Sequence, residues 1–507
     1  MNNLEHNQLH LPNKTQKDSP WFFVIIAAAF VGLYLFNISG WLIHDDEGTD
    51  LYEVWQLSIG KQPGIDFVAE QQPLFLTIGQ SLLNLSEDSV TAVGYVRLAS
   101  AIQVLAGAIF LGFVVKQLWD VPTAVLTLGV TLTSGLIYEQ ARLYRPDPMM
   151  FAWELFGLGF VLLAVKLGKR PYWAAAGVAY GIAVLTKLFG IFPVIGLVFF
   201  FLYLFIKQPQ QWQEHLRNGI AFSIPFLLVS GGVSLLLYSQ LGFYYQEVFN
   251  QHLSLGQEKT ILDQMIITVS TYLSFILVNM VFLFILPLLI MNRRSGESNI
   301  GFPENAIVNT QLIVPLLFIF ITRPIFPRYF MFLAPTLSLI LALQLKGFFN
   351  KISSSNKNAN PIISVLVVVT IIFGSIVTFP NIYRRLVRQE NDTIALAHFI
   401  QDHTAPNDIV VSDYASLNFH AERESIYEAS IIAGGRIGGG IVTGELLIKQ
   451  MEETQTELVL VHVAGGTPHQ LIKLIDFELF QSYLDENFEL ITVFNRTEQK
   501  IEVYARK

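Results

Sequence analysis

The chain has no cysteine among its 507 residues. It therefore contains no disulfide, no zinc–thiolate site and no cysteine nucleophile, and cysteine usage says nothing about its redox compartment. Charge is also scarce, because Asp, Glu, Lys and Arg make up 14% of the residues, against about 25% in average soluble domains. The deficit is concentrated in the first three quarters of the chain, where long apolar runs recur. That composition predicts an integral membrane protein.

Further absences narrow the function. No dense basic face appears in the sequence, so we expect no nucleic-acid partner. The glycine-rich segment 434–440 lacks the strand–GxGxxG–helix context of a nucleotide site, no Walker lysine follows it, and we interpret it as a flexible loop. Residues 1–20 are polar and precede an apolar run without a small-residue cleavage site. This pattern predicts a cytoplasmic tail and an uncleaved first helix.

Apolar runs long enough to cross a bilayer recur along the chain. A span needs about 20 apolar residues and must be helical, because lipid offers the backbone no hydrogen-bond partners. The runs predict about eleven transmembrane helices, at 21–43, 90–115, 121–141, 149–166, 172–187, 190–206, 217–239, 263–291, 309–322, 329–345 and 361–380. Residues 74–86 are apolar but too short to span, which favours a re-entrant or interfacial helix. The predicted fold class is a polytopic α-helical membrane protein, with its transmembrane domain at 21–380.

The loops indicate how the chain is oriented. With the N-terminus inside, Lys and Arg are only slightly more numerous on the cytoplasmic side, which is a weak bias. The first loop, residues 44–89, is more informative. It is rich in Asp and Glu and contains a single lysine, Lys61, whereas the N-terminal tail carries Lys14 and Lys17. We expect a multi-pass protein of the plasma (inner) membrane, with the first loop extracytoplasmic.

The sequence changes character after about residue 380. Strand-like segments alternate with helical patterns there. The strands are expected at 408–412, 457–463, 489–494 and 501–504, and the helices at 394–400, 445–451 and 480–484. The alternation predicts a small soluble α/β domain at 381–507, and an odd number of spans places it on the same side as the first loop. His462, inside a strand-like run, is expected to be a packed residue.

The strongest cluster of chemically active residues begins the first loop. Asp45, Asp46 and Glu47 follow the first span directly, and their mutual repulsion must be relieved by cations, hydrogen bonds or water. Glu70 lies further on, just before the short apolar segment. Loops between spans often carry function. The alternative is a solvated loop that merely ends the helix.

A second cluster lies between the third and fourth predicted helices. Pro146 and Pro148 prevent a helix from continuing and hold the turn extended. Arg145 and Asp147 are thereby presented at the membrane edge, on the same side as Asp46. An arginine there suits a lipid phosphate, whose oxygens match its planar fork. A short charged hairpin is the alternative.

Three more cations are expected at the same edge. Lys187 ends the fifth predicted helix, where snorkelling of its side chain to the interface is the simpler role on local sequence alone. Arg323 and Arg328 flank a turn that contains two prolines. They form either an anion site or, with Tyr329, an interfacial anchor.

Together these residues match the chemistry of group transfer from a lipid phosphate. A carboxylate acts as a general base on an acceptor hydroxyl or amine, while Arg and Lys stabilise the charge that grows on the departing phosphate. The apolar bundle offers a groove for a polyprenyl tail. The sequence has no ATP or nucleotide-sugar motif, which fits an activated sugar delivered on the far side of the membrane.

The motifs that carry these residues resemble those of a known family. The chain resembles the GT-C glycosyltransferases, in the branch of the protein O-mannosyltransferases and the aminoarabinose transferases of lipid A. The likeness covers roughly residues 20–345. Its motifs are Asp45-Asp46-Glu47, Glu70-Gln71-Gln72-Pro73, Arg145-Pro146-Asp147, the stretch from Gly181 to Lys187, and Pro327-Arg328-Tyr329 with Pro335.

The resemblance implies an inverting transfer of a sugar from a polyprenyl-phosphate donor held in membrane lipid. It implies Asp46 as the catalytic carboxylate. Asp45 is an additional acid that shares or replaces that role. Asp147 would assist by ordering Arg145 or the acceptor.

The same resemblance assigns the other predicted site residues. The lipid phosphate would be bound by Arg145, Lys187 and Arg328. Glu47 and Glu70 would serve the acceptor or substrate. Gln71 and Gln72 stand where relatives often carry an acid and a base, which leaves open both the role of Glu70 and the acceptor, a protein, a lipid or a glycan.

Several alternatives stay open. A transporter or flippase of lipid-linked sugars predicts ionisable residues near the membrane midplane and repeated halves, neither of which stands out in the sequence. A lipid-linked glycan polymerase or ligase would use similar donors, and a non-catalytic scaffold is the simplest reading. Asp45, Asp46 and Glu47 also offer the oxygen ligands that Mg²⁺ or Mn²⁺ prefers, so metal dependence is undecided.

Overall fold

The structure is a computed structural model of the chain. It describes residues 20–39, 45–236, 261–285, 287–288, 302–321, 326–355, 365–366, 368–372, 392–465, 470–496 and 499–507. The predicted cytoplasmic tail, Arg323 and most of the helix predicted at 361–380 lie outside the described residues, as does the side chain of Asp45.

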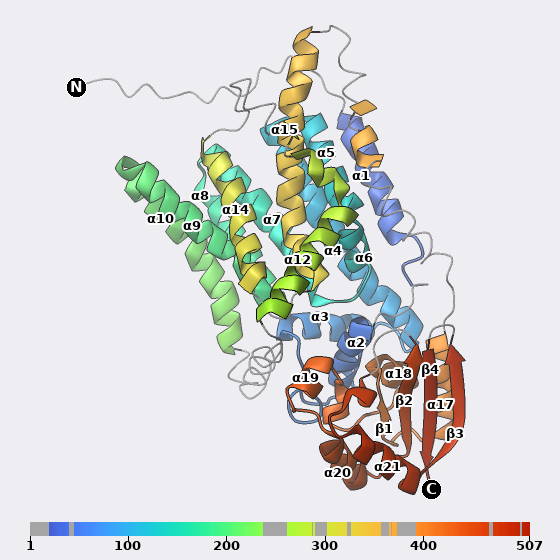
Figure 1. Cartoon of the computed structure of the whole chain (residues 1–507). Coiled ribbons are helices and arrows are strands. Elements are labelled where there is room, and N and C mark those ends of the chain that lie inside the picture. Colours follow the sequence, from blue (N-terminus) through green and yellow to red (C-terminus); the bar gives the residue numbers. More distant parts are fainter. Residues whose placement is uncertain are drawn as a thin grey trace, which may run out of the picture.

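Most of the described chain is a bundle of helices (Figure 1). The bundle helices are α1 (Pro20–Leu35), α4 (Ser89–Leu118), α5 (Val121–Thr133), α6 (Gly135–Ala141), α7 (Pro146–Leu167), α8 (Arg170–Thr186), α9 (Ile191–Lys207), α10 (Trp212–Leu227), α12 (Ile261–Val278), α14 (Phe302–Ile321) and α15 (Leu333–Ser355). Short 3₁₀ or π segments adjoin them, namely η1 (Leu188–Gly190), η2 (Pro209–Gln211), η3 (Leu228–Gly232), η4 (Met280–Phe284) and η5 (Pro327–Phe332).

The apolar helices are those of a membrane protein. Among the described residues, five helical stretches are long and apolar enough to cross a bilayer, and six if the bent pair α5–α6 is one span. Shorter apolar helices occur at Trp21–Leu35, Pro73–Leu83, Met265–Ile276 and Ala306–Ile319. The predicted count of eleven spans is therefore not confirmed, although most predicted helices are found near their expected positions.

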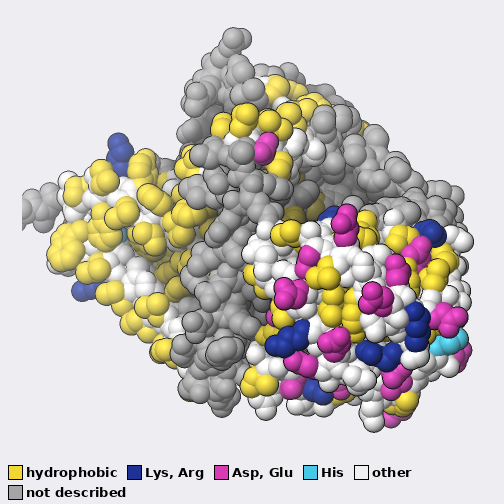
Figure 2. All heavy atoms as spheres, turned by 60° about the horizontal axis from the view of Figure 1, so that its bottom comes forward, with side chains coloured by type: hydrophobic (Ala, Val, Ile, Leu, Met, Phe, Trp, Pro, Cys, Tyr) yellow, Lys and Arg dark blue, Asp and Glu magenta, His cyan; other side chains and the backbone are white. Residues whose placement is uncertain are grey.

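The outer surface of α9 and α10 is apolar. Large hydrophobic side chains such as Phe199, Leu202, Ile206, Ile224 and Leu227 are exposed there. In Figure 2 hydrophobic side chains dominate the helical part at the left, whereas charges of both signs are interspersed over the C-terminal part at the right. An exposed apolar face of this extent is stable against lipid, not against water.

A buried arginine joins α1 to the turn before α7. α5 and α6 meet at a bend of 68°, and Arg142 follows α6 directly. Its guanidinium donates to the hydroxyl of Tyr138 at 2.6 Å and to the carbonyls of Phe36 and Asn37 at 2.6 and 3.0 Å. A cation at the C-terminal end of a helix satisfies carbonyls that have no partner within the helix. This contact fixes the segment that leads into the Arg–Pro–Asp turn.

The first loop is not irregular but largely helical. It contains α2 (Asp45–Ser58) and α3 (Pro73–Leu83). α3 begins at Pro73, which suits the first helical position because proline has no N–H to leave unpaired. Its 11 residues confirm a short helix at the segment predicted to be re-entrant or interfacial. Leu51 and Val54 of α2 pack against Phe75 of α3 and Val96 of α4 in one hydrophobic cluster.

The C-terminal part contains a four-stranded sheet, as predicted. The strands are β1 (Val410–Ser412), β2 (Leu458–Gly465), β3 (Phe488–Arg496) and β4 (Gln499–Arg506). Their order is β1-β2-β4-β3, with β1 parallel to β2 and the other pairs antiparallel. The helical elements are α17 (Asp392–His403), α18 (Ala415–Ala421), η6 (Glu428–Ser430), α19 (Gly434–Gly438), α20 (Gly444–Thr454), η7 (Leu471–Lys473) and α21 (Phe477–Asn487).

The sheet is covered by helices on both faces. α20 and α21 pack on the face that carries Val459 and Val461, and α17 and α18 pack on the face that carries Leu458 and Leu460. Alternate residues of β2 therefore enter two separate cores, which explains why its sequence is continuously apolar. His462 is fully buried in this strand, as expected of a packed histidine.

The glycine-rich segment is not the flexible loop that we expected. Residues Gly434–Gly438 form α19, a single helical turn. Arg436 within it is buried and forms an ion pair with Glu428. Arg436 is the only charged residue of the segment, and its charge is neutralised within the protein by this ion pair. The neighbouring glycines allow the close turn.

α2 is held between the helical bundle and the C-terminal part (Figure 1). Gly48 of α2 faces α18 so closely that a Cβ at Gly48 would lie 2.4 Å from the Cβ of Ser416. Beyond α2, the Val68 N–H donates to Ser430 Oγ at 2.9 Å, and Lys61 pairs with Glu424 at 2.7 Å. The first loop and the C-terminal part therefore share an interface that extends from Gly48 to Val68 of the loop.

A buried ion pair joins α2 to the bundle. The Arg97 Nε and Nη2 atoms donate to the two carboxylate oxygens of Glu47 at 2.7 and 2.6 Å, and both side chains are fully buried. The Tyr144 N–H donates to the same carboxylate at 2.8 Å. Such a pair is stable only when its geometry is good and its remaining hydrogen-bond capacity is used, and both conditions are met here.

We expect Glu47→Gln to destabilise the protein by about 3–5 kcal/mol, because it leaves the buried guanidinium of Arg97 without a compensating charge. The measurement is thermal unfolding of the full chain in membranes or detergent, followed by tryptophan fluorescence. Glu87→Gln is the control, because the Glu87 side chain is exposed and its change should cost no more than about 0.5 kcal/mol. Equal unfolding midpoints for Glu47→Gln and the wild type would contradict a stabilising role for the pair.

Candidate active site

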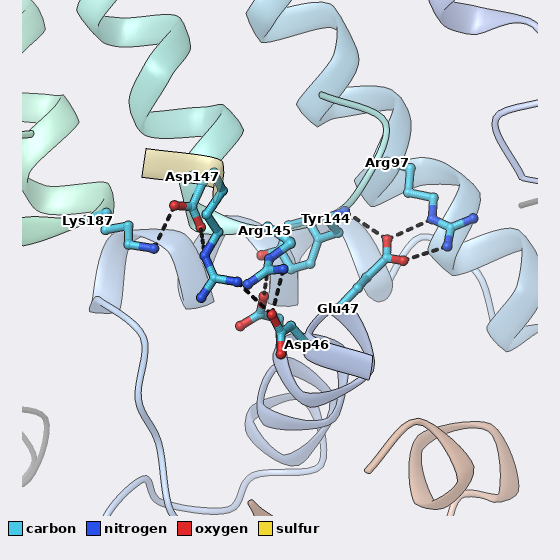
Figure 3. Close-up of polar contacts among 9 residues, drawn as sticks. Asp46, Glu47, Arg97, Tyr144, Arg145, Asp147 and Lys187 are labelled. Carbon is cyan, nitrogen blue, oxygen red and sulfur yellow. Dashed lines mark hydrogen bonds and ion pairs between the residues drawn. The ribbon is translucent and has the colours of Figure 1, made fainter. Parts of the chain in front are cut away.

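The first turn of α2 carries a carboxylate that contacts two arginines from distant parts of the chain (Figure 3). Asp46 Oδ2 lies 2.8 Å from Arg145 Nη1 and 2.7 Å from Arg328 Nη1. The side chain of Asp46 is 46% exposed, whereas those of Arg145 and Arg328 are 5% and 18% exposed. The carboxylate is therefore the accessible member of a largely buried group.

The same group continues to a lysine through a second carboxylate. Lys187 Nζ donates to Asp147 Oδ1 at 2.8 Å, and Arg328 Nε lies 3.8 Å from Asp147 Oδ2. Asp147 is almost fully buried. We call these residues the ion cluster, and its members are Asp46, Arg145, Asp147, Lys187 and Arg328. All five are residues that the sequence analysis assigned to catalysis or phosphate binding.

Local sequence rules explain how the cluster residues are presented. Arg145 precedes Pro146 and has the extended backbone that a residue before proline prefers. Asp147 occupies the first turn of α7, where the helix dipole favours a negative charge. Lys187 ends α8 in an extended conformation, and Arg328 lies in η5. Each side chain therefore leaves its element at an end, and the ends meet at one edge of the bundle.

The lysine titrates close to physiological pH. Burial lowers the pKa of the Lys187 ammonium to about 8, although the neighbouring carboxylate of Asp147 favours its charged form. The positive charge of Arg328 nearby lowers this pKa further. Lys187 is thus largely charged at pH 7 and loses its proton in the mildly alkaline range.

Aromatic rings line the cationic side of the cluster. Lys187 Nζ lies 5.5 Å from the ring centroid of Phe189 and 5.6 Å from that of Tyr329. The guanidinium carbon of Arg328 lies 4.3 Å from the ring centroid of Phe326. Cation–π contacts hold the charges in place at little cost in hydrogen-bonding capacity. The rings contact the cations without using the N–H groups that donate to Asp147 and Asp46.

Two further carboxylates lie beside the cluster, and the sequence analysis missed both. Asp50 is buried, and its Oδ2 lies 3.9 Å from Arg145 Nε. The buried carboxylate of Glu53 accepts from the Glu70 N–H at 3.3 Å. Burial raises the pKa of both Asp50 and Glu53 well above the usual range. The available signal was the spacing of Asp46, Asp50 and Glu53, which places all three on one stripe of a helix.

Two of the predicted site residues do not join the ion cluster. Glu47 follows Asp46 in sequence but points to Arg97 instead (Figure 3). Glu70 is half-buried and approaches the site through its backbone contact with Glu53. A role for either residue toward the acceptor remains a prediction.

The suggested metal site remains a prediction as well. Within the described part of the chain, no group of three or more His, Asp or Glu side chains is placed to hold a metal ion. The side chain of Asp45 lies outside the described residues, so the set Asp45, Asp46 and Glu47 is untested as a whole. The described carboxylates are instead engaged with arginines, since Asp46 and Glu47 both form ion pairs.

The cluster can bind a strongly anionic group beside an accessible carboxylate. Three cations face two carboxylates within it, so it has a net positive charge when Lys187 is protonated. Because Asp46 is exposed and uses one oxygen for both arginines, a phosphate group could replace it as their partner. Such an exchange would release the Asp46 carboxylate from these two guanidinium groups.

A family model matches the middle of the chain. Residues 73–241 match the family described as dolichyl-phosphate-mannose-protein mannosyltransferase. The match covers about a third of the chain and includes Arg145, Asp147 and Lys187. No curated protein matches the sequence.

The fold is similar to those of solved membrane enzymes. ArnT from Cupriavidus metallidurans, in a crystal structure bound to undecaprenyl phosphate, superposes with a TM-score of 0.66 at 14% identity, over 96% of this chain and 98% of ArnT. The oligosaccharyltransferase AglB from Archaeoglobus fulgidus, in complex with an inhibitory peptide and a dolichol-phosphate, gives a TM-score of 0.54 at 12% identity, over 96% of this chain and 74% of AglB.

The two findings agree with the resemblance drawn from the sequence motifs. The superposition supplies the fold, which is that of the GT-C enzymes over nearly the whole chain. Residues 73–241 match a family of mannosyltransferases. The chain therefore combines a glycosyltransferase family match over that segment with the fold of the solved enzymes ArnT and AglB.

Proposed function

We propose that the chain transfers a sugar, with inversion, from a polyprenyl-phosphate donor to an acceptor on the extracytoplasmic side of the plasma (inner) membrane. The observation that carries this proposal is the ion cluster, in which Asp46 is accessible while Arg145, Lys187 and Arg328 converge behind it. The bound undecaprenyl phosphate of ArnT and dolichol-phosphate of AglB support the class of donor.

The cations would bind the donor phosphate. Arg145 and Arg328 offer planar guanidinium groups that match phosphate oxygens, and Lys187 adds a point charge. All three lie at ends of bundle elements, so a phosphate there would leave its polyprenyl chain against the apolar helices. Asp147 would keep Lys187 and Arg328 in position, because it contacts both.

The chemical step would be a single displacement at the anomeric carbon. An acceptor hydroxyl or amine attacks the carbon on the face opposite the phosphate, and a new bond forms there. The bond from carbon to the phosphate oxygen breaks, and its electron pair stays on the phosphate, where the three cations stabilise the negative charge. The acceptor proton passes to Asp46, which acts as the general base.

Donor binding would also prepare the base. A carboxylate held by two guanidinium groups is a weak base, because the cations stabilise its charged form. When the donor phosphate takes over Arg145 and Arg328, Asp46 loses that stabilisation and its proton affinity rises. The order would then be donor first and proton transfer second.

A transporter or flippase is the weaker reading. Such proteins place ionisable residues near the membrane midplane. In the described part of the chain the ion cluster lies instead at the ends of α2, α7 and α8 and in η5. A polymerase or ligase of lipid-linked glycans would use the same cluster and differ only in the acceptor.

We expect Asp46→Asn to reduce transfer by about 10²–10⁴-fold, because the amide cannot accept the acceptor proton. The measurement is complementation of a deletion strain, with mass spectrometry of membrane lipids to detect the polyprenyl-phosphate sugar that accumulates. Asp66→Asn is the matched control, because Asp66 lies in the same loop outside the cluster and its carboxylate contact with the Gln62 N–H survives in the amide.

Two outcomes would count against the proposed role of Asp46. Donor turnover by Asp46→Asn at the wild-type rate would exclude a general base at this position. An equal loss in Asp66→Asn would show that the effect belongs to folding of the loop.

We expect donor binding to weaken as pH rises through about 8, because the Lys187 ammonium, whose pKa is lowered to about 8, loses its charge there rather than near 10.4. Donor binding is strongest well below pH 8, because Lys187 is then fully protonated and its positive charge attracts the phosphate. The measurement is the pH dependence of kcat/KM for the donor, which reports the free enzyme. Lys187→Arg keeps its charge at all accessible pH values and should lack this alkaline decline. An unchanged decline in Lys187→Arg would assign it to another group.

A further inference from the structure

A cavity lies outside the ion cluster, where the first loop meets the C-terminal part. It has a volume of about 290 Å³ and is formed by the last turn of α2, the end of α3, the start of α4 and α18. Its size is at the lower end of the range of small-molecule sites, ~300–1,000 Å³. The cavity suits one or two compact groups and not a macromolecular surface.

The walls of this cavity combine aromatic rings with hydrogen-bonding groups. Trp55 and Phe419 line it, and the polar side chains of Asn84, Glu87 and Glu422 surround them. Asn84, Glu87 and Glu422 are exposed, so their amide and carboxylate groups are available to a ligand. An aromatic face packs against the C–H groups of a sugar ring, while carboxylates and amides accept hydrogen bonds from its hydroxyls.

The charge of the cavity excludes an anionic ligand. Glu87 and Glu422 give it two negative charges, and none of its described lining residues is basic. His420 lies behind the wall, where its Nδ1 contacts Ser89 Oγ at 2.8 Å. Burial lowers the pKa of His420 to about 4, so its ring is neutral at physiological pH. A phosphate or a polyprenyl phosphate would be repelled, and a neutral or amine-bearing group would not.

We propose that this cavity between α2, α3, α4 and α18 binds a saccharide unit that is neutral or carries an amine. The assignment of that saccharide to the acceptor rests on the proposed function. Trp55 follows Asp46 by nine residues of α2, which corresponds to roughly 13 Å along the helix and two and a half turns. The cavity is therefore separate from the ion cluster, and a sugar bound in it does not contact the reacting atoms. An acceptor that uses both places must extend over roughly 13 Å or more, from the saccharide in the cavity to the hydroxyl or amine that reacts beside Asp46.

The test is saturation-transfer NMR on the full chain in nanodiscs, which avoids detergents with sugar headgroups. The probes are the methyl glycosides of glucose, galactose, mannose and N-acetylglucosamine, together with glucosamine. Glucose 6-phosphate is the anionic control, and a lysine tripeptide tests the alternative of a peptide ligand. We expect transfer to at least one neutral or amine-bearing sugar and none to glucose 6-phosphate.

Variants locate the binding. Trp55→Ala should weaken it roughly tenfold or more, since the aromatic contact is lost. Glu422→Gln should also weaken it, and this exposed side chain can be changed without disturbing the core. Asp46→Asn should bind the sugar as the wild type does. Absence of transfer to every sugar, binding of the tripeptide alone, or equal binding by the wild type, Trp55→Ala and Glu422→Gln would overturn the proposal.

The link to the acceptor has its own readout. In the deletion strain, Trp55→Ala should leave the donor lipid partly accumulated, at a level between the wild type and Asp46→Asn. Full turnover by Trp55→Ala would overturn the assignment to the acceptor while the binding result stands. The opposite outcome is also distinguishable. If the cavity binds sugar but Asp46→Asn is fully active, the proposed transfer mechanism is wrong while the cavity remains a saccharide site.

Discussion

The buried ion pair between Glu47 and Arg97 is the contact on which the arrangement of the site depends. It fixes the first turn of α2 against α4, and a helix turns by about 100° from one residue to the next. With Glu47 directed into the bundle (Figure 3), the preceding Asp46 must point elsewhere, and the direction left to it is toward Arg145 and Arg328. Glu47 therefore has a structural role, and its ion pair directs the neighbouring Asp46 toward the two arginines.

The ion cluster solves an electrostatic problem that any site for a lipid phosphate faces. Arg145, Lys187 and Arg328 repel one another, and without a ligand their largely buried charges need partners. Asp147 provides a permanent partner for Lys187, and Asp46 provides one for the arginines that is exposed and therefore replaceable. Asp46 neutralises the two arginines as a phosphate would, so the proposed exchange replaces one anion by another and costs little free energy.

Much of this could be predicted from the sequence, and the exceptions have a common cause. The apolar runs placed most of the bundle helices, and the proline rule correctly predicted extended backbone at Arg145. Pro146 and Pro148 were expected to hold an extended turn, but they lie in the first turn of α7, where proline is tolerated. The helical form of α2 was missed because its stripe of Asp46, Asp50 and Glu53 is polar, and the partners that make it stable come from other segments. The same holds for Arg436, whose glycine-rich neighbours suggest a loop while its ion pair with Glu428 makes a structured turn. Local patterns reveal elements, but they do not reveal which distant residue neutralises a charge.

The C-terminal part fixes the position of α2 through direct packing, although it carries no recognisable functional motif. α18 closes on Gly48, two residues after Asp46, with no room for a side chain between them. The bundle holds α2 from one side through Arg97, and the C-terminal part holds it from the other. A helix of 14 residues is marginal by itself in water, so its position requires both. The C-terminal part therefore helps to position the helix that carries Asp46.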